Sequence, residues 1–404
     1  PPVAPTPRPR MSRRGTAQNR PTMGVCRVLC CCGCAASSSV ALAVGLAALA
    51  VRSRIPEPAF VQDACGNAVA EDIRVLDGFP FRCGWQQLRP EGFSSSAYVP
   101  YAYIQPNGSW CWSNSGFVAR AGHASGGGLL VDTLTDPVLT ASMLTKLGEL
   151  RGSRGMSPVG ALIYTHPDVD HILGNQAIPP GVPRLGTKEA QQEVTVQKAV
   201  VPALLVTVNM GNFIWEAAQL VGPAALLAAT PSVLEGALLK LLGWARFQSF
   251  MAKFNLPGLD AERLPEFSRF LDTGTEVSVE GSILPVTFQH FGPMHSKSDS
   301  VLLLPESRVA FTGDLLFIGI APVMWAGPAK AWIAALDKLL GMTGADWLFV
   351  PGHGPVTDAE GVRSVRRFME YVDHGVSEAC VDLPLSDEAS DEACGERVLE
   401  GMPA

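Results

Sequence analysis

Four short motifs bring together the side chains of this sequence that are best suited to bind metal ions. Imidazole and carboxylate groups are common ligands of divalent cations. Four of the seven histidines fall in these motifs. The motifs read THPDVDH at 165–171, GPMH at 292–295, TGD at 312–314 and PGHG at 351–354. They predict a metal site whose ligands come from four separate segments.

Each motif stands at the end of a predicted strand. The strands are apolar runs, rich in β-branched and aromatic residues, at 159–166, 276–292, 308–317 and 345–354. A sheet holds the backbone rigid, while the loops at strand ends leave open positions for substrate and water. Apolar residues at helical spacing predict helices at 136–150, 328–342 and 359–375. This alternation of strands and helices predicts an α/β layered domain.

The ordered set of motifs resembles the metallo-β-lactamase superfamily. Its hallmark is a His-x-His-x-Asp-His loop, followed by a single His, a bridging Asp and a final His. The resemblance covers residues 95–376 and includes flanking residues such as VDT at 131–133 and VPGHGPVTD at 350–358. Any one motif would be a weak signal, but four in order are a strong one. The resemblance implies a four-layer αββα sandwich and an enzyme that is a metal-dependent hydrolase.

The resemblance also implies a pair of divalent cations. The first would be bound by His166 and His295, the second by Asp170, His171 and His353, and Asp314 would bridge them. Such a pair lowers the pKa of a bound water from 15.7 to about 7. The resulting hydroxide would attack an ester, thioester, lactone or phosphoester, and Asp170 would orient it as the catalytic carboxylate.

Position 168 departs from the superfamily pattern, because it is Asp where His is most common. If Asp168 ligates the first metal, three carboxylates surround the two cations, which favours iron or manganese over zinc. If the Asp side chain is too short to reach, the first site is weakened or empty. Ligation is the favoured interpretation, and zinc is the expected metal, with iron or manganese as alternatives.

Two other functions compete with hydrolysis. Asp168 supports an iron-dependent oxidoreductase of the sulfur dioxygenase type, which iron content and oxygen uptake would reveal. A non-catalytic, membrane-tethered binding protein with the same fold would hold no metal, or one metal without turnover. A net charge of −7 and the lack of an obvious arginine cluster argue against a nucleic-acid partner. The oligomeric state is not predicted.

The substrate is expected to be a small or lipid-like molecule. Large apolar side chains lie in two loops that, by analogy with the superfamily, approach the metals: Tyr101, Tyr103, Trp110, Trp112, Met324 and Trp325. They would suit an apolar or amphipathic substrate. The alternative interpretation is that these side chains pack between sheet and helix.

The sequence predicts several segments around the catalytic domain, which is expected at 60–376. Residues 1–27 form a basic tail with clustered cysteines, and 28–51 contain no charged residue. A run of this length can cross a bilayer, and its N-terminal positive flank places the domain on the lumenal or extracellular side. A cleaved signal peptide or an organellar transit peptide is the alternative. Residues 377–404 form an acidic tail, in which Cys380 and Cys394 could form a disulfide.

An apolar helical insert is predicted at about 188–259 within the catalytic domain. The favoured interpretation is that it buries its apolar face on its own domain. The alternative is a cap over the active site that contacts a membrane or a lipid-like substrate.

Overall fold

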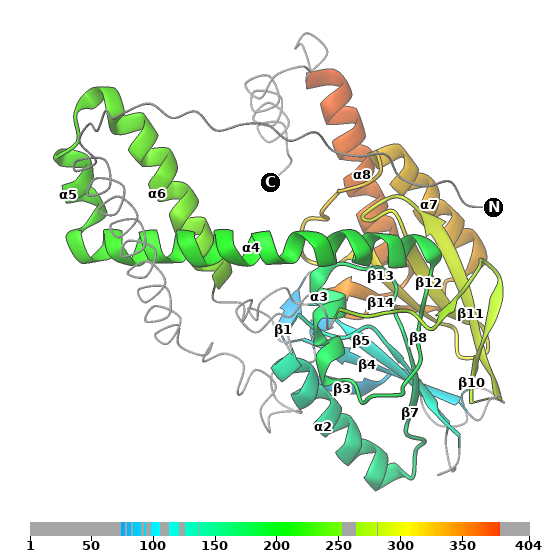
Figure 1. Cartoon of the computed structure of the whole chain (residues 1–404). Coiled ribbons are helices and arrows are strands. Elements are labelled where there is room, and N and C mark those ends of the chain that lie inside the picture. Colours follow the sequence, from blue (N-terminus) through cyan, green and yellow to red (C-terminus); the bar gives the residue numbers. More distant parts are fainter. Residues whose placement is uncertain are drawn as a thin grey trace, which may run out of the picture. The chain divides into compact units, whose positions relative to one another are not determined.

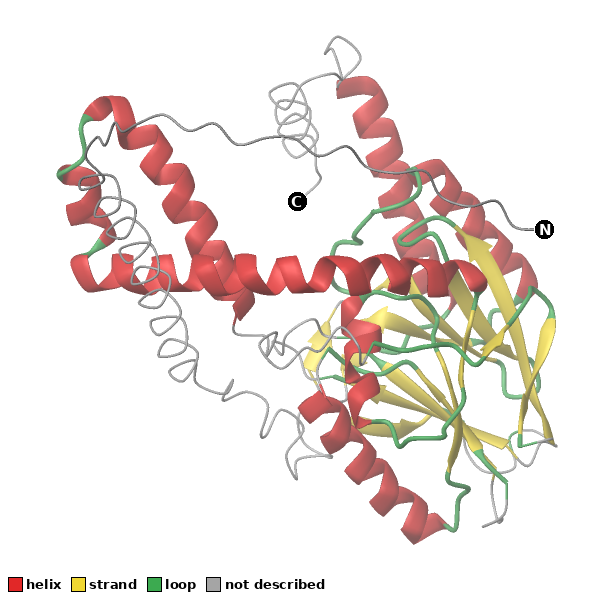
Figure 2. Ribbon diagram, in the orientation of Figure 1, coloured by secondary structure: helices red, strands yellow, loops and turns green. Residues whose placement is uncertain are grey.

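Two β-sheets lie between layers of helices (Figure 1, Figure 2). The structure is a computed structural model, and it describes residues 74–76, 79–81, 84–89, 93, 98–105, 113–120, 126–135, 137–252, 264–280 and 282–379. The basic tail, the apolar segment 28–51, Trp110, Trp112 and the Cys380–Cys394 pair lie outside the described residues.

The first sheet has seven strands. In spatial order they are β3 (Gly84–Gln87), β4 (Tyr98–Ile104), β5 (Ser115–Arg120), β6 (Gly128–Val131), β7 (Val159–Ile163), β8 (Arg184–Gly186) and β9 (Arg269–Phe270). The strands from β3 to β6 pair antiparallel and those from β6 to β9 pair parallel. A separate antiparallel pair is formed by β1 (Arg74–Leu76) and β2 (Phe79–Phe81).

The second sheet has five strands in sequence order. They are β10 (Thr275–Val279), β11 (Ser282–Gly292), β12 (Asp299–Leu304), β13 (Val309–Phe317) and β14 (Leu348–His353). The pairings are antiparallel except that between β13 and β14. The parallel connection from β13 to β14 passes through α7 (Ala329–Met342), because parallel neighbours need a crossover.

Three apolar clusters separate four layers. Alternation along each strand sends successive side chains to opposite faces, so Phe117 packs on the helical side and Val118 faces the second sheet. The cluster between the sheets joins side chains such as Ile163 and Phe311. The outer clusters seat α2 (Pro137–Arg154) on the first sheet, and α7 with α8 (Ala359–Ala379) on the second. This is the predicted αββα sandwich.

The helical insert consists of α4 (Lys188–Val221), α5 (Pro223–Ala228) and α6 (Ser232–Ala252). The first half of α4 packs on the first sheet through Val194 and Val201. Further along, α4 lies against α6 at Gly211, where a Cβ atom would collide with Gln248. The far end of the insert is different, since no residue from 219 to 241 is buried. The expectation that the insert buries its apolar surface on its own domain therefore holds only for its base.

Two smaller expectations need correction. Asp314 lies inside β13 rather than at its end. Gly313 adopts a left-handed conformation (φ 49°), and the register with β14 shifts on both sides of it, so the strand continues past the motif. The last helix extends to Ala379, so the predicted tail begins after residue 379 rather than at 377. Amphipathic spacing in α8 continues past the predicted boundary, which explains the difference.

Candidate metal centre

The first motif leaves β7 and turns directly into a short helix. The strand ends at Ile163, and α3 (Val169–Ile172) begins after Asp168. This turn places His166 before the helix and Asp170 and His171 within it. All three side chains are buried, so a single loop supplies three inward-facing donor groups.

Glycines make room for the carboxylate at the middle of the site. Any Cβ atom at Gly352 would collide with a carboxylate oxygen of Asp314, and one at Gly313 would meet the Thr165 hydroxyl at 2.5 Å. The glycines of the TGD and PGHG motifs are therefore needed for close approach of the segments, as well as for their backbone conformation.

Asp314 lies at the centre of a ring of imidazoles. The Nε2 atoms of three histidines lie 3.1–3.2 Å from its carboxylate oxygens, and that of His166 lies 3.7 Å away. The three nearer histidines are His171, His295 and His353. One carboxylate thus contacts histidines from all three of the other motifs.

The donor atoms fall into two groups that could each hold a metal ion. His166, His295 and Asp314 form one group, and Asp170, His171 and His353 form the other. Within each group the ligand atoms lie within 4.8 Å of one another. The two groups meet at Asp314, whose Oδ1 faces His171 and whose Oδ2 faces His295.

Asp168 lies at the edge of the first group. Its Oδ2 is 2.8 Å from Nε2 of His295, but the residue is not part of either three-residue group. Asp168 is also partly exposed, whereas the six other candidate ligands are all buried. The Asp168 side chain is therefore long enough to contact the Nε2 atom of His295, a candidate ligand of the first group.

The donor set passes a simple test for metal binding. Buried polar groups are normally hydrogen-bonded, yet Nε2 of His166, Nε2 of His171 and Oδ1 of Asp314 have no hydrogen-bond partner. The two imidazole nitrogens lie 3.7 Å and 3.1 Å from the Asp314 carboxylate oxygens. Nitrogen and carboxylate oxygen donors of this kind suit zinc and related divalent cations, so the residues fit the group that the resemblance implies.

The electrostatics of the centre are dominated by burial and by Asp314. Burial lowers the pKa of His166 to about 4 and raises the pKa of Asp170. Burial also acts on His295, but Asp314 and Asp168 outweigh it and raise the pKa of that imidazole to about 10. The surrounding histidines overcome burial at Asp314 and hold its pKa well below the usual value. The Asp314 carboxylate at the middle of the site is therefore held in its ionised form.

Asp132 contacts the first motif, although the sequence pattern does not mark it as a candidate site residue. Its carboxylate accepts hydrogen bonds from the Thr165 backbone N–H at 2.8 Å and from the Thr165 hydroxyl at 2.7 Å. It also accepts one from Nδ1 of His171 at 3.2 Å, which directs Nε2 of that ring toward the centre. Its backbone is left-handed (φ 56°). The VDT sequence at 131–133 is one of the flanking segments that resemble the superfamily, but a local match does not predict which residues Asp132 contacts.

We expect Asp132→Ala to lower metal affinity and hydrolytic activity by about 10- to 100-fold, because carboxylates that orient a ligating imidazole typically contribute this much. Titration with zinc and measurement of kcat at saturating zinc would check the two effects. Asp132→Asn should recover part of the loss, since an amide oxygen still accepts the His171 hydrogen bond. Full metal affinity in Asp132→Ala would contradict the positioning role.

Other contacts fix the remaining imidazoles. Nδ1 of His295 donates to the Val323 carbonyl at 2.7 Å, which points its Nε2 inward. The ring of Phe317 stacks on His353, with ring centroids 4.8 Å apart. Asp299 accepts hydrogen bonds from the backbone N–H groups of Met294 and Ser296, at 3.0 Å each, and so secures the loop that carries His295.

Of the large apolar side chains expected near the metals, some pack in the core and others belong to a loop that approaches the site. Tyr101 and Tyr103 are buried in the cluster between the first sheet and its helices, so they pack in the core. The other loop does approach the site, because the Trp325 backbone N–H donates to the His295 carbonyl at 3.2 Å. The Trp325 side chain is 72% exposed.

Two described histidines lie outside the four motifs. His290 is partly buried, and His374 is exposed beside Glu378.

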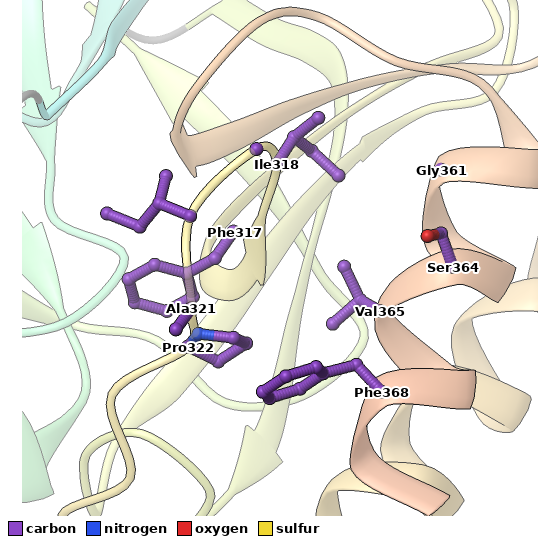
Figure 3. A pocket seen from close by; sticks show the side chains of 10 residues that line it. Phe317, Ile318, Ala321, Pro322, Gly361, Ser364, Val365 and Phe368 are labelled. Carbon is purple, nitrogen blue, oxygen red and sulfur yellow. The ribbon is translucent and has the colours of Figure 1, made fainter. Parts of the chain in front are cut away.

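An apolar cavity of about 350 Å³ adjoins the centre (Figure 3). Residues 317–322 form one wall, and Gly361, Ser364, Val365 and Phe368 of α8 form the other. Figure 3 shows Val365 and Phe368 directed from α8 toward Pro322. Phe317 belongs to the cavity and also stacks on His353, so the cavity and the centre share a side chain.

Comparison with family models matches one part of the chain. Residues 108–180 match the model of the metallo-beta-lactamase superfamily. The four motifs and the αββα sandwich agree with this match and support the metallo-beta-lactamase superfamily. No curated protein matches the chain.

Several solved structures are similar to the chain at low sequence identity. The metallo-beta-lactamase FIM-1 from Pseudomonas aeruginosa, in a mono-zinc form, is 14% identical with a TM-score of 0.41, covering 72% of this chain and 96% of that chain. A metallo-beta-lactamase from Pontibacter korlensis is 14% identical with a TM-score of 0.43, covering 71% and 99%. One from Hirschia baltica is 13% identical with a TM-score of 0.42, covering 71% and 98%.

Proposed function

We propose that this protein is a hydrolase that uses two divalent cations to cleave an ester, thioester, lactone or phosphoester. Members of the superfamily are generally metal-dependent hydrolases. The observation that carries the proposal is the position of Asp314, whose two carboxylate oxygens face histidines from the three other motifs. A carboxylate shared in this way could contact two cations lying about 3.5–4 Å apart, the usual separation in two-metal sites.

Each candidate ligand has a role in the proposal. The first cation would be held by His166, His295 and Asp314, and the second by Asp170, His171, His353 and Asp314. When bound, the cation pair supplies Lewis acidity and lowers the pKa of a water molecule. The Asp170 carboxylate, whose Oδ2 lies 3.3 Å from Nε2 of His353, would orient that water and accept its proton. Phe317 shields His353 from solvent on one face.

Zinc is the proposed metal, and Asp168 is proposed as an additional ligand of the first cation. Its Oδ2 lies 2.8 Å from Nε2 of His295, which is close enough for both atoms to contact one ion. A further carboxylate favours harder cations, so iron or manganese remains the alternative. Oxygen uptake by the iron-loaded protein would instead support an oxidoreductase of the sulfur dioxygenase type.

A substrate with an apolar acyl chain is proposed, because an apolar cavity adjoins the centre. We expect kcat/KM to rise by about tenfold or more from the acetyl to the octanoyl ester of 4-nitrophenol, since each buried CH₂ contributes about 0.8 kcal/mol. Ser364→Trp should fill the cavity and abolish this preference while leaving the acetyl ester unaffected. Arg363→Trp, at the neighbouring exposed position of α8, is the matched control. Equal rates on both esters in the parent protein would refute the acyl site.

The proposed chemistry itself is tested with the zinc-loaded full chain. Ester hydrolysis should depend on the metal, disappear on chelation and return when zinc is added back. It should be lost in Asp170→Ala. Hydrolysis that survives complete removal of metal would rule out the proposed function.

Membrane attachment through residues 28–51, with the catalytic domain on the lumenal or extracellular side, is proposed from the sequence alone. A secreted or organellar protein is the alternative. Accessibility of the catalytic domain to protease in intact and opened membrane vesicles distinguishes these locations.

A further inference from the structure

The far end of the helical insert exposes an unusual amount of apolar surface. None of the residues 219–241 is buried, and α5 has no buried residue. Leu220 and Val233 are 90% and 86% exposed. The leucines and valines of this stretch are Leu220, Val221, Leu226, Leu227, Val233, Leu234, Leu238, Leu239 and Leu241. A continuous apolar surface of this kind marks a contact site on a folded protein.

We infer that residues 219–241, which we call the insert tip, dock on the surface of a lipid bilayer. The composition favours lipid over a protein partner. Protein interfaces are enriched in aromatic residues and arginine, which supply most of their binding energy. The insert tip contains no Phe, Trp, Tyr, Met or Arg. Its side chains are mostly aliphatic, and Glu235 and Lys240 are its two charged residues.

The residues next to the insert tip also suit a membrane surface. Trp215 precedes it on α4 and Trp244 follows it on α6, and both are partly buried. The Arg246 guanidinium lies 5.9 Å from the centre of the Trp215 ring, and Gly211 holds α4 close to Trp244. Tryptophan and basic side chains are typical of the headgroup region of a bilayer. The side chains of Trp215, Trp244 and Arg246 therefore lie at the boundary between the exposed and the packed parts of the insert.

The depth of docking is limited by the size and charge of the insert tip. The exposed turns of α6, residues 232–241, extend about 15 Å at 1.5 Å per residue, half of the ~30 Å hydrocarbon core. The tip carries two exposed charges, Glu235 and Lys240. These charges favour a position of the tip within one leaflet, close to the lipid headgroups. The helix α4 is long and apolar enough to cross a bilayer by length and composition, but its first half packs on the first sheet.

Docking at the insert tip would connect the metal centre to the lipid surface through α4, along which Gln197 and Leu220 are about 35 Å apart at 1.5 Å per residue. Gln197 of α4 donates to the carbonyl of Pro167 in the first motif at 2.8 Å. Ser298, beside the loop of His295, donates to Glu193 of α4 at 2.7 Å. The helix that carries the insert tip is therefore attached to two of the ligand-bearing loops.

The test is photo-cross-linking of the full chain, reconstituted in phosphatidylcholine vesicles that contain a photoactivatable phosphatidylcholine. Peptide mapping separates the insert tip from residues 28–51, so cross-links at that predicted anchor do not confuse the result. We expect lipid adducts on 219–241 and none on α8. Leu220→Asp/Val233→Asp should reduce the tip adducts by about tenfold or more, because desolvating two carboxylates is costly. Both positions are exposed, so the variant should keep its Tm.

A control and a second variant keep the outcome decisive. Val138→Asp/Ile283→Asp, at positions 52% and 64% exposed on α2 and β11, should leave the tip adducts unchanged. Glu235→Gln should increase them, since a neutral side chain enters lipid more readily. Absence of adducts on 219–241 would overturn the proposal. A cross-link from Lys240 to a second copy of the chain in detergent, before lipid is added, would overturn it in favour of a protein interface.

Discussion

Replacing Asp314 by Ala should reduce the proposed zinc-dependent ester hydrolysis by about 10³-fold or more. Asp314 is the one described carboxylate that contacts candidate ligands of both groups, so its loss should empty or distort both sites. Electrostatic stabilisation by metal ions contributes several kcal/mol to a transition state, and 1.36 kcal/mol corresponds to a factor of ten in rate. Steady-state kinetics at saturating zinc, together with measured metal content, would check this.

The matched control for this substitution is Asp337→Ala. Asp337 is an exposed carboxylate on α7 that pairs with Arg366 at 2.6 Å, far from the ligand motifs in sequence. Its removal should leave kcat within about twofold, since exposed ion pairs contribute about 1 kcal/mol or less to stability. If Asp314→Ala retained its metal and most of its activity, the two-cation interpretation would fail.

Zinc loading should raise the thermal stability of the catalytic domain substantially. At a free metal concentration about 1,000-fold above Kd, binding adds about 4 kcal/mol per site to the free energy of unfolding. For a domain of this size each occupied site corresponds to roughly 5–10 °C in Tm. The physical reason is that His166, His171 and Asp314 each bury a polar atom that has no hydrogen-bond partner, and the two proposed cations together would satisfy all three.

Thermal denaturation with chelator, and with graded zinc, measures this effect. Asp314→Ala should show little response to zinc, whereas Asp337→Ala should respond like the parent protein. A Tm that is the same with chelator and with excess zinc would show that these side chains do not bind the metal.

Much of the fold and the candidate ligands could be predicted because they leave local signals. Strand alternation, helical spacing and glycine-bearing motifs are readable from neighbouring residues, and they predicted β7, β13, β14, α7 and α8 within a few residues. The very short strands β8 and β9, of three and two residues, have no such signal. They form because the first sheet offers an edge with which a passing segment can pair.

Contacts between distant segments were harder to predict. Asp132 acts on Thr165 and His171, which lie 33 and 39 positions away, and no periodicity reports such a contact. Tyr101 and Tyr103 resemble pocket residues by type, but strand alternation turns them into the core. The position of Asp314 within β13 depends on the left-handed conformation of Gly313, which the sequence permits but does not require.

The apolar composition of the helical insert does not predict which part of it is buried. Its apolar residues suggested a surface buried on its own domain, and the base of α4 does pack in this way. The insert tip has the same composition, yet none of it is buried. The difference comes from geometry, because α4 extends beyond the edge of the sheet (Figure 1).

Elemental analysis of the purified full chain, after reconstitution with zinc and removal of loose metal, tests the central claim most directly. We predict two metal ions per chain in the parent protein and no more than one in Asp170→Ala. A parent protein that retains no metal under these conditions would contradict the account, whatever its activity.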